Sequence, residues 1–266
     1  MPLDAVVISA LAAEIGDKIT GGRIDKVQMP ERDVLLLSIR GQKENLRLII
    51  SSNVGSSRIH FTRASFENPA EPPMFCMLMR KHLTGARIVS VTQPERERML
   101  VLELDTRDEM GVESRKKLVA ELMGRSSNIV LVGEDGNIID CIRRMDFGGD
   151  ALRRLLPGMI YRMPPRQDKA GFFDTPAGER ARLWRLSDPA VPPEKRLMDI
   201  FSGLSPLICR ELAYRCYGDE DNMPEAMDAL AESAAAGDFT PYMLTRAGEP
   251  LDFSFMRVSQ YGKAAQ

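Results

Sequence analysis

The residue types that most often do chemistry are scarce in this chain of 266 residues. Its two histidines, His60 and His82, lie apart in the sequence, and its four cysteines form no CxxC pair. A metal site needs several such ligands at short spacing, so the sequence predicts no metal site. The sequence also contains no HExxH, GxSxG, P-loop or GxGxxG pattern. We therefore predict no cofactor and no catalytic constellation.

One feature of the N-terminus keeps an enzyme as an alternative. Removal of Met1 would expose the secondary amine of Pro2, and such an amine is the nucleophile of some DNA glycosylases. The opposing interpretation is that proline is simply tolerated at the second position. We prefer the second interpretation and expect that this chain is not an enzyme.

Charged and polar residues gather at three places along the chain, and two of them would suit a phosphate ligand. Residues 93–98 mix acids with bases between two expected strands, and a solvated turn is the alternative interpretation. Residues 121–128 join two further strands, where Gly124 and Arg125 offer backbone N–H groups and a guanidinium to a phosphate or to a buried turn. Residues 141–170 have the strongest local basic excess, which indicates a phosphate-bearing partner. The basic residues of this third segment are Arg143, Arg144, Arg153, Arg154, Arg162, Arg166 and Lys169.

A short hairpin at residues 201–206 joins two expected helices. Ser205 is a good N-cap, and Pro206 suits the first helical position. A hairpin at Gly203 that leads into a helix N-terminus can present N–H groups to a phosphate, as in a helix–hairpin–helix module. The second glycine of strong modules is missing, and acidic residues downstream oppose contact with a nucleic-acid backbone. These acids are Asp219, Glu220, Asp221, Glu225 and Asp228.

The overall composition limits the possible partners and location. The formal net charge is -2 and the isoelectric point is about 5.9, so nucleic-acid binding must depend on local clusters. The cysteines lie in apolar stretches, which fits free thiols in a reducing compartment. No stretch approaches the about 20 apolar residues of a membrane span. The N-terminus lacks a basic leader, so we expect a cytoplasmic protein without a membrane partner.

The hydrophobic pattern predicts an α+β fold, with an antiparallel-sheet domain of few helices at residues 1–170. A small all-α domain follows at residues 171–240, and residues 241–266 form a β-like segment that we expect to return to the first domain. The strands are predicted at residues 23–28, 33–40, 45–51, 87–92, 99–104, 117–122, 128–132 and 137–142, with a hairpin turn at 133–136. The helices are predicted at residues 4–19, 73–83, 179–186, 193–201, 205–217 and 223–235.

The helix at residues 73–83 is expected to lie at the centre of the first domain. It begins after two prolines, and residues 74–79 are all apolar, so the pattern predicts burial on several sides. Arg80, Lys81 and His82 follow at its end, where cations complement the helix dipole. We expect this basic end to neighbour the turn at residues 93–98.

Several of these blocks together resemble the NFACT family, and specifically its bacterial RqcH branch, in older usage called fibronectin-binding protein A-like. The most specific block is residues 66–83, and the similarity covers nearly the whole chain. The other blocks are residues 21–26, 121–129, 156–158, Tyr161, 164–165, 203–206 and 211–212.

The resemblance implies a fold and a function. The N-terminal domain would be similar to that of formamidopyrimidine-type DNA glycosylases, followed by a helix–hairpin–helix domain. Family members act in ribosome quality control on the large ribosomal subunit that carries stalled peptidyl-tRNA. Bacterial members recruit alanyl-tRNA for C-terminal alanine tailing, and continue into a coiled coil and an RNA-binding domain. This chain resembles the N-terminal part of such a protein.

The resemblance also implies a tRNA site. The family's Asp–Arg pair for tRNA corresponds to Glu97 and Arg98, so the arginine is kept and the acid is one methylene longer. The predicted tRNA-binding residues are Glu97, Arg98, Arg125, Arg80, Lys81, Arg153 and Gly203. A surface adhesin that binds fibronectin, suggested by the older family name, and a DNA glycosylase-like enzyme are the alternatives.

Overall fold

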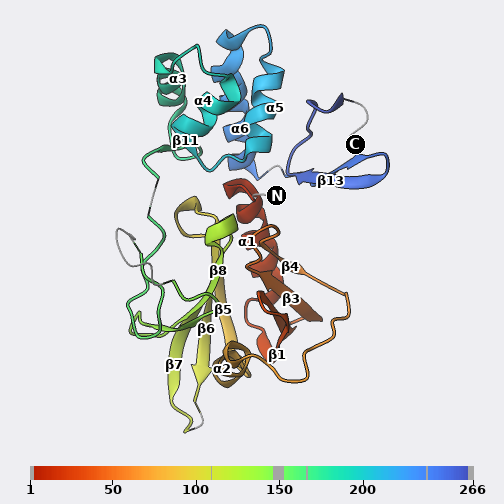
Figure 1. Ribbon diagram of the computed structural model, residues 1–266, viewed down its shortest axis with the longest axis vertical. Helices are drawn as coiled ribbons and strands as arrows, with labels where there is room; N and C mark the ends of the chain where they lie inside the picture. Colours follow the sequence, from red (N-terminus) through yellow and green to blue (C-terminus); the bar gives the residue numbers. More distant parts are fainter. Residues whose placement is uncertain (1–2, 109, 146–152, 166, 238, 263–266) are drawn as a thin grey trace. The chain divides into compact units, whose positions relative to one another are not determined.

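A computed structural model describes residues 3–108, 110–145, 153–165, 167–237 and 239–262. The chain divides into two compact units, and Figure 1 shows their elements. Of the described residues, unit 1 contains 11–165, and unit 2 contains 3–10 and those after Pro165. Helix α1 (Ala5–Ile19) therefore contributes to both units, whereas the sequence analysis placed it wholly in the first domain.

Unit 1 is built on an antiparallel sheet that has nine strands among the described residues. In spatial order these are β4 (Arg58–Phe61), β3 (Asn45–Ser51), β2 (Val34–Arg40), β1 (Arg23–Glu31), β5 (Arg87–Thr92), β6 (Met99–Arg107), β7 (Glu113–Glu121), β8 (Asn128–Val132) and β9 (Ile138–Cys141). The prediction of an α+β fold dominated by an antiparallel sheet is confirmed. The sequence did not predict β4, because its four residues include Arg58 and His60 and form no apolar run.

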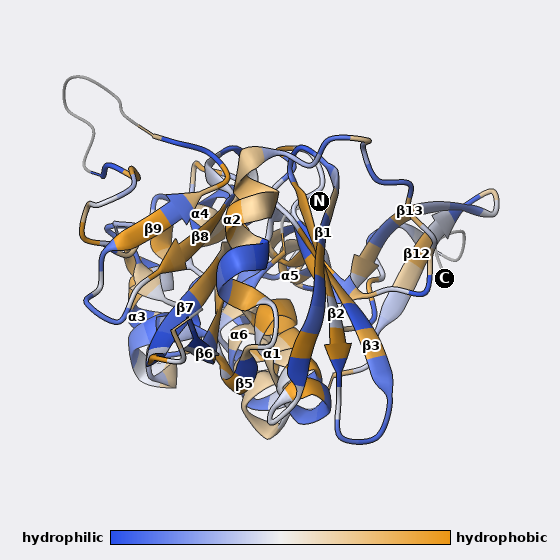
Figure 2. Ribbon diagram, turned by 90° about the horizontal axis from the view of Figure 1, so that it is seen from below, coloured by the Kyte–Doolittle hydropathy of each residue, from blue (hydrophilic) through white to orange (hydrophobic). Residues whose placement is uncertain are grey.

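The pairing of β1 with β5 at the middle of the sheet is short, with Arg23 opposite Arg87 and backbone hydrogen bonds from Ile24 to Ala86 and from Ile88 to Gly22. Helix α2 (Met74–Leu83) contacts β1, β6 and β9, and Figure 2 shows it between β1 and the pair β8–β9. Because one face of α2 meets the sheet, only four of its side chains are buried, namely Phe75, Cys76, Met79 and Leu83. Met74 and Met77 are 70% and 45% exposed, so the expectation that the whole apolar run is covered is wrong.

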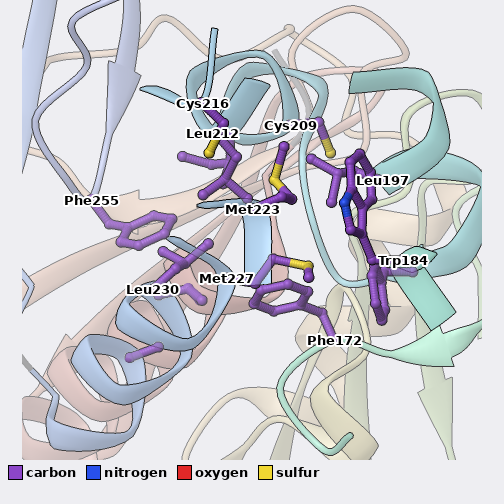
Figure 3. Close-up of a cluster of buried hydrophobic side chains, with 14 residues drawn as sticks. Phe172, Trp184, Leu197, Cys209, Leu212, Cys216, Met223, Met227, Leu230 and Phe255 are labelled. Atoms are coloured by element: carbon purple, nitrogen blue, oxygen red, sulfur yellow. The ribbon is translucent and has the colours of Figure 1, made fainter. Parts of the chain in front are cut away.

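Unit 2 contains four α-helices among the described residues, α3 (Ala177–Leu186), α4 (Pro193–Ile200), α5 (Pro206–Arg215) and α6 (Met223–Ala236). Two short parallel strands, β10 (Ala170–Gly171) and β11 (Phe201–Ser202), pair beside them. Figure 3 shows the buried side chains of this unit, including Phe172, Trp184 and Met227. Two buried arginines complete the packing, and the Arg196 guanidinium lies 3.6 Å from the Trp184 ring centroid.

The C-terminal segment is a hairpin of β12 (Tyr242–Arg246) and β13 (Glu249–Ser254). The chain that follows it is held to α5 by Glu211, whose buried carboxylate accepts hydrogen bonds from the backbone N–H groups of Ser259 and Gln260 at 2.9 and 3.0 Å. Val258 also packs against Leu207 of α5. These contacts place the segment in unit 2, so the expected return to the first domain is not found among the described residues.

Candidate nucleic-acid interface

The connection between β5 and β6 is a strained turn. It contains a short 3₁₀ helix, η1 (Pro94–Arg96), in which Glu95 and Arg96 have φ angles of 48° and 53°. This left-handed conformation costs a residue other than glycine about 1–2 kcal/mol. The turn is held by hydrogen bonds from Gln93 Nε2 and from the Glu97 N–H, which donates to the Pro94 carbonyl at 2.8 Å. Stored backbone strain of this kind is often found at functional sites.

Arg98 follows this turn and lies beside the next connection of the sheet. Its carbonyl accepts a 2.9 Å hydrogen bond from the N–H of Leu122, and Met99 pairs in register with Glu121. The chain then forms a second 3₁₀ turn, η2 (Gly124–Ser126), which carries Arg125. The β5–β6 and β7–β8 connections therefore lie at the same end of the sheet.

The side chains of these two connections are available to a ligand. Arg125 is exposed and Arg98 is half-buried. Among the described residues, neither guanidinium has a hydrogen-bond or ion-pair partner, and neither does the Glu97 carboxylate. Ser127, directly after η2, is fully buried, and its hydroxyl has no partner in the described part of the chain. Such a group calls for an explanation, because buried polar groups are normally hydrogen-bonded.

Arg153, a predicted tRNA contact, lies in the interior of unit 1. Its guanidinium donates two hydrogen bonds to the carboxylate of Glu121, at 3.0 and 2.5 Å, and the Tyr161 hydroxyl donates a third at 2.7 Å. The side chains of Glu121 and Arg153 are 0% and 12% exposed. Burial, followed by the nearby Glu121 charge, raises the pKa of the Tyr161 hydroxyl well above its ordinary value. Arg153 is therefore committed to an internal ion pair.

Sequence reasoning missed Glu121 as the centre of this cluster. The sequence did contain an indication of it, because Glu121 is the last residue of β7 and directly follows an apolar run. A charge in such a buried place requires a partner. The identity of that partner was hidden, because Arg153 lies 32 residues further along the chain.

Arg80 and Lys81 lie away from the Arg98 turn. Arg80 Nε donates to the Val27 carbonyl of β1, and α2 ends close to the start of β5. The six residues of β5, at about 3.3 Å each, then extend about 20 Å to the turn. Figure 1 shows α2 at the end of β6 and β7 that is remote from it. The expectation that the basic end of α2 neighbours the turn is therefore wrong.

The Gly203 hairpin already carries a carboxylate of this chain. Ser205 caps α5 as predicted, and the Gly203 carbonyl accepts a hydrogen bond from the Ala5 N–H at 3.1 Å. Asp4, which is 5% exposed, accepts from the Val7 N–H and from the Ser205 hydroxyl. Burial raises the pKa of Asp4 to about 6. A carboxylate of this chain thus lies against the capping residue of the helix end that the sequence analysis offered to a phosphate.

The basic segment at residues 141–170 is largely paired. Arg143 and Arg144 form ion pairs with Asp33 and Asp140 at 3.8 and 3.6 Å, and Lys169 donates to a backbone carbonyl. Pro2 and Arg166 lie outside the described residues. In the described ranges no cluster of side chains could hold a metal ion, and no helix is both long and apolar enough to span a bilayer.

A model of the "NFACT N-terminal and middle domains" matches residues 4–266 of this chain. The chain belongs to the NFACT family. The protein named "Rqc2 homolog RqcH" of Bacillus subtilis (strain 168) is 36% identical over 251 residues, which cover 94% of this chain and 44% of that protein. "Ribosome quality control complex subunit NEMF" of Mus musculus is 27% identical over 138 residues, or 52% of this chain and 12% of that protein.

The structure of the N-terminal part of the fibronectin/fibrinogen-binding protein from Streptococcus suis has a TM-score of 0.81 and 26% identity to this NFACT chain. The match covers 97% of this chain and 91% of that one. The family predicted from the sequence is confirmed. The chain spans less than half the length of the Bacillus subtilis relative that it matches.

Proposed function

We propose that this chain is the tRNA-binding N-terminal part of a ribosome quality-control factor. The name of the mouse relative and the similarity to Rqc2 homologues support the role in ribosome quality control. The resemblance to the bacterial branch adds the partners, namely the large ribosomal subunit with stalled peptidyl-tRNA and alanyl-tRNA for C-terminal alanine tailing. This work takes place in the cytoplasm.

The proposal depends mainly on two arginines that lie on neighbouring strand connections at one end of the sheet. Arg98 and Arg125 have no internal partner in the described part of the chain, and the hydrogen bond from Leu122 to the Arg98 carbonyl fixes the two connections to each other. Guanidinium groups bind phosphates bidentately and stay charged, so two of them at one end of a sheet suit an RNA backbone. Glu97, beside Arg98, is placed to accept hydrogen bonds from ribose or base.

The other predicted contacts contribute less. Arg153 forms a buried ion pair with Glu121, and the Gly203 carbonyl is bonded to the Ala5 N–H. Arg80 and Lys81 lie at the far end of the sheet. We therefore propose Glu97, Arg98 and Arg125 as the primary contacts, and keep the four others as predictions outside this surface.

The experiment is filter binding of tRNA to Arg98→Ala, Arg125→Ala and the double variant, across about 50 to 200 mM salt. Each lost phosphate contact should weaken binding about tenfold, or about 1.4 kcal/mol, and reduce the salt slope by about 0.7–0.9. Arg63→Ala, an exposed arginine after β4, is the matched control and should change neither quantity. Equal affinity of parent and double variant would refute the site.

Two finer structural assignments belong to the same proposal. The antiparallel sheet of unit 1 suits a domain of the formamidopyrimidine-glycosylase type at residues 1–170. The α4–Gly203–α5 arrangement, with its Ser205 cap, suits a helix–hairpin–helix domain at residues 171–240, followed by the segment at 241–266. Fold similarity does not transfer the reaction, and borohydride trapping with abasic DNA should yield no adduct.

A second candidate function is fibronectin binding, which the name of the Streptococcus suis neighbour favours. Surface labelling of intact cells, combined with binding to immobilised fibronectin, separates the two candidates. A surface-exposed protein that binds fibronectin equally well with and without Arg98 and Arg125 would favour this candidate.

A further inference from the structure

A second charged site lies at the end of the unit 1 sheet that is opposite to the Arg98 turn. A cleft of about 740 Å³ is bordered by β1, the residues after α2, β5, β6, β7 and the β8–β9 turn. Arginines from four strands line it, namely Arg23, Arg87, Arg107 and Arg115. Its volume falls in the range of about 300–1,000 Å³ that is typical of small-molecule sites.

Like charges face each other across the centre of this cleft. Arg23 and Arg87 are directly opposed in register, and Arg87 is in turn opposed to Asp105. Asp105 is occupied by Arg115, whose Nε and Nη2 donate to the same carboxylate oxygen at 3.1 and 3.0 Å. Arg23 Nη1 donates only to the Gly85 carbonyl, and Arg87 has no partner among the described residues. Like charges directly opposite each other destabilise a pair of strands, so a bound anion would stabilise this one.

The remaining acids of the cleft do not neutralise this pair. The Glu113 carboxylate forms a 2.5 Å ion pair with Arg107, which lies opposite it in the pairing of β6 with β7. Glu134 lines the cleft and forms no ion pair with a described residue, although its charge acts on Lys116, so it is a carboxylate that opposes an anion there. Four arginines against three carboxylates leave the lining with a net charge of +1.

A further cation and two hydroxyl groups lie at the edge of the cleft. Lys116 is half-buried, and its Nζ donates to Thr106 Oγ1 and Ser114 Oγ at 2.5 and 2.9 Å. Both hydroxyl residues line the cleft. Burial lowers the pKa of Lys116, and the charges of Asp108 and Glu134 oppose that shift. The pKa of His82 in α2 is lowered, first by burial and then by the positive charges of Lys116 and Lys81.

We propose that this cleft binds the phosphate groups of a small ligand, either free pyrophosphate or the diphosphate of a nucleotide. Arg23 and Arg87 would clamp the phosphate oxygens through their guanidinium groups. No aromatic side chain is among the described lining residues, so the site recognises phosphate rather than a stacked base. The cleft and the proposed tRNA surface lie at opposite ends of strand β6, so the two sites are separate.

The test is isothermal titration of the purified protein with sodium pyrophosphate at fixed ionic strength, and with ADP in a second arm. Arg87→Ala and Arg23→Ala should each weaken binding about tenfold or more. Glu134→Gln should tighten it several-fold, since it removes a negative charge of the described lining that no ion pair neutralises. Arg63→Ala outside the cleft should leave the affinity unchanged.

The outcomes separate this site from the alternatives. Equal binding of pyrophosphate and ADP indicates that the phosphates alone are recognised, and tighter binding of ADP identifies a nucleotide. No binding of either ligand, or binding that Arg87→Ala and Glu134→Gln both leave unchanged, overturns the proposal. It is also overturned if the substitutions affect only an RNA oligonucleotide, because the cleft is then a nucleic-acid contact. Since Arg98→Ala does not touch the cleft, failure of the tRNA site leaves this test intact.

Discussion

Replacing Arg153 with methionine should destabilise unit 1 far more than an ordinary surface substitution. The change leaves the fully buried Glu121 carboxylate with the Tyr161 hydroxyl as its remaining donor in this cluster. Breaking a buried ion pair on one side costs about 3–5 kcal/mol, because an uncompensated charge stays in the interior. Whole domains are stable by only about 5–15 kcal/mol, so we expect a partly unfolded or strongly weakened unit 1.

Removal of the whole cluster should restore most of this loss. The triple variant Glu121→Leu, Arg153→Met, Tyr161→Phe has no buried charge and no orphaned hydroxyl at these three positions. Apolar replacement of a buried pair is often neutral, so the coupling between the positions should be about 2 kcal/mol or more. If the triple variant is no more stable than Arg153→Met alone, the ion pair is not the cause and the reasoning is refuted.

The measurement must report on the stability of unit 1, and different probes can follow the two units separately. Trp184, the only tryptophan, lies in unit 2, so its fluorescence should show an unchanged transition in every variant. Amide hydrogen exchange of β7, where Val119 and Ala120 are buried, should show the loss in the single variant and its recovery in the triple variant. The triple variant should also keep the parent's salt slope for tRNA, since Arg153 is not a phosphate contact. A slope reduced by about 0.7–0.9 would contradict its internal role.

Two further predictions concern unit 2. Because burial raises the pKa of Asp4 from 3.8 to about 6, the folded state binds a proton more tightly, and the free energy of unfolding should fall by about 3 kcal/mol as the pH rises from about 4 to about 6. Asp4→Asn keeps an acceptor for the Val7 N–H and should abolish this slope in urea titrations followed by tryptophan fluorescence, whereas the exposed Asp17→Asn should keep it. Ala247 and Gly248 form the β12–β13 turn with φ angles of 51° and 85°, so Ala247→Asn should stabilise the hairpin by about 1 kcal/mol, seen as slower proteolysis there. Faster cleavage would show that the turn is not strained.

Most strands of the sheet were predictable, because their boundaries depend on residues that are close together in the sequence. Predicted strands 45–51, 87–92 and 128–132 match β3, β5 and β8, and the hairpin turn at 133–136 joins β8 to β9. Turn residues and β-branched runs act over a few positions, so neighbouring residues suffice to predict them. Ser205 at the cap of α5 was predictable for the same reason. β4 was missed because a short edge strand carries polar residues and leaves no such pattern.

The role of each arginine was not predictable in this way, because Arg98 and Arg153 are the same residue type in segments of similar composition. Sequence alone established the family, the α+β class and the presence of basic clusters in a weakly acidic protein. Only the tertiary structure decided that Arg153 is buried against Glu121, while Arg98 and Arg125, on neighbouring connections, have no partner among the described residues. The physical reason is that burial and ion pairing depend on which distant segments the sheet brings together, and those contacts are not encoded in the spacing of nearby residues.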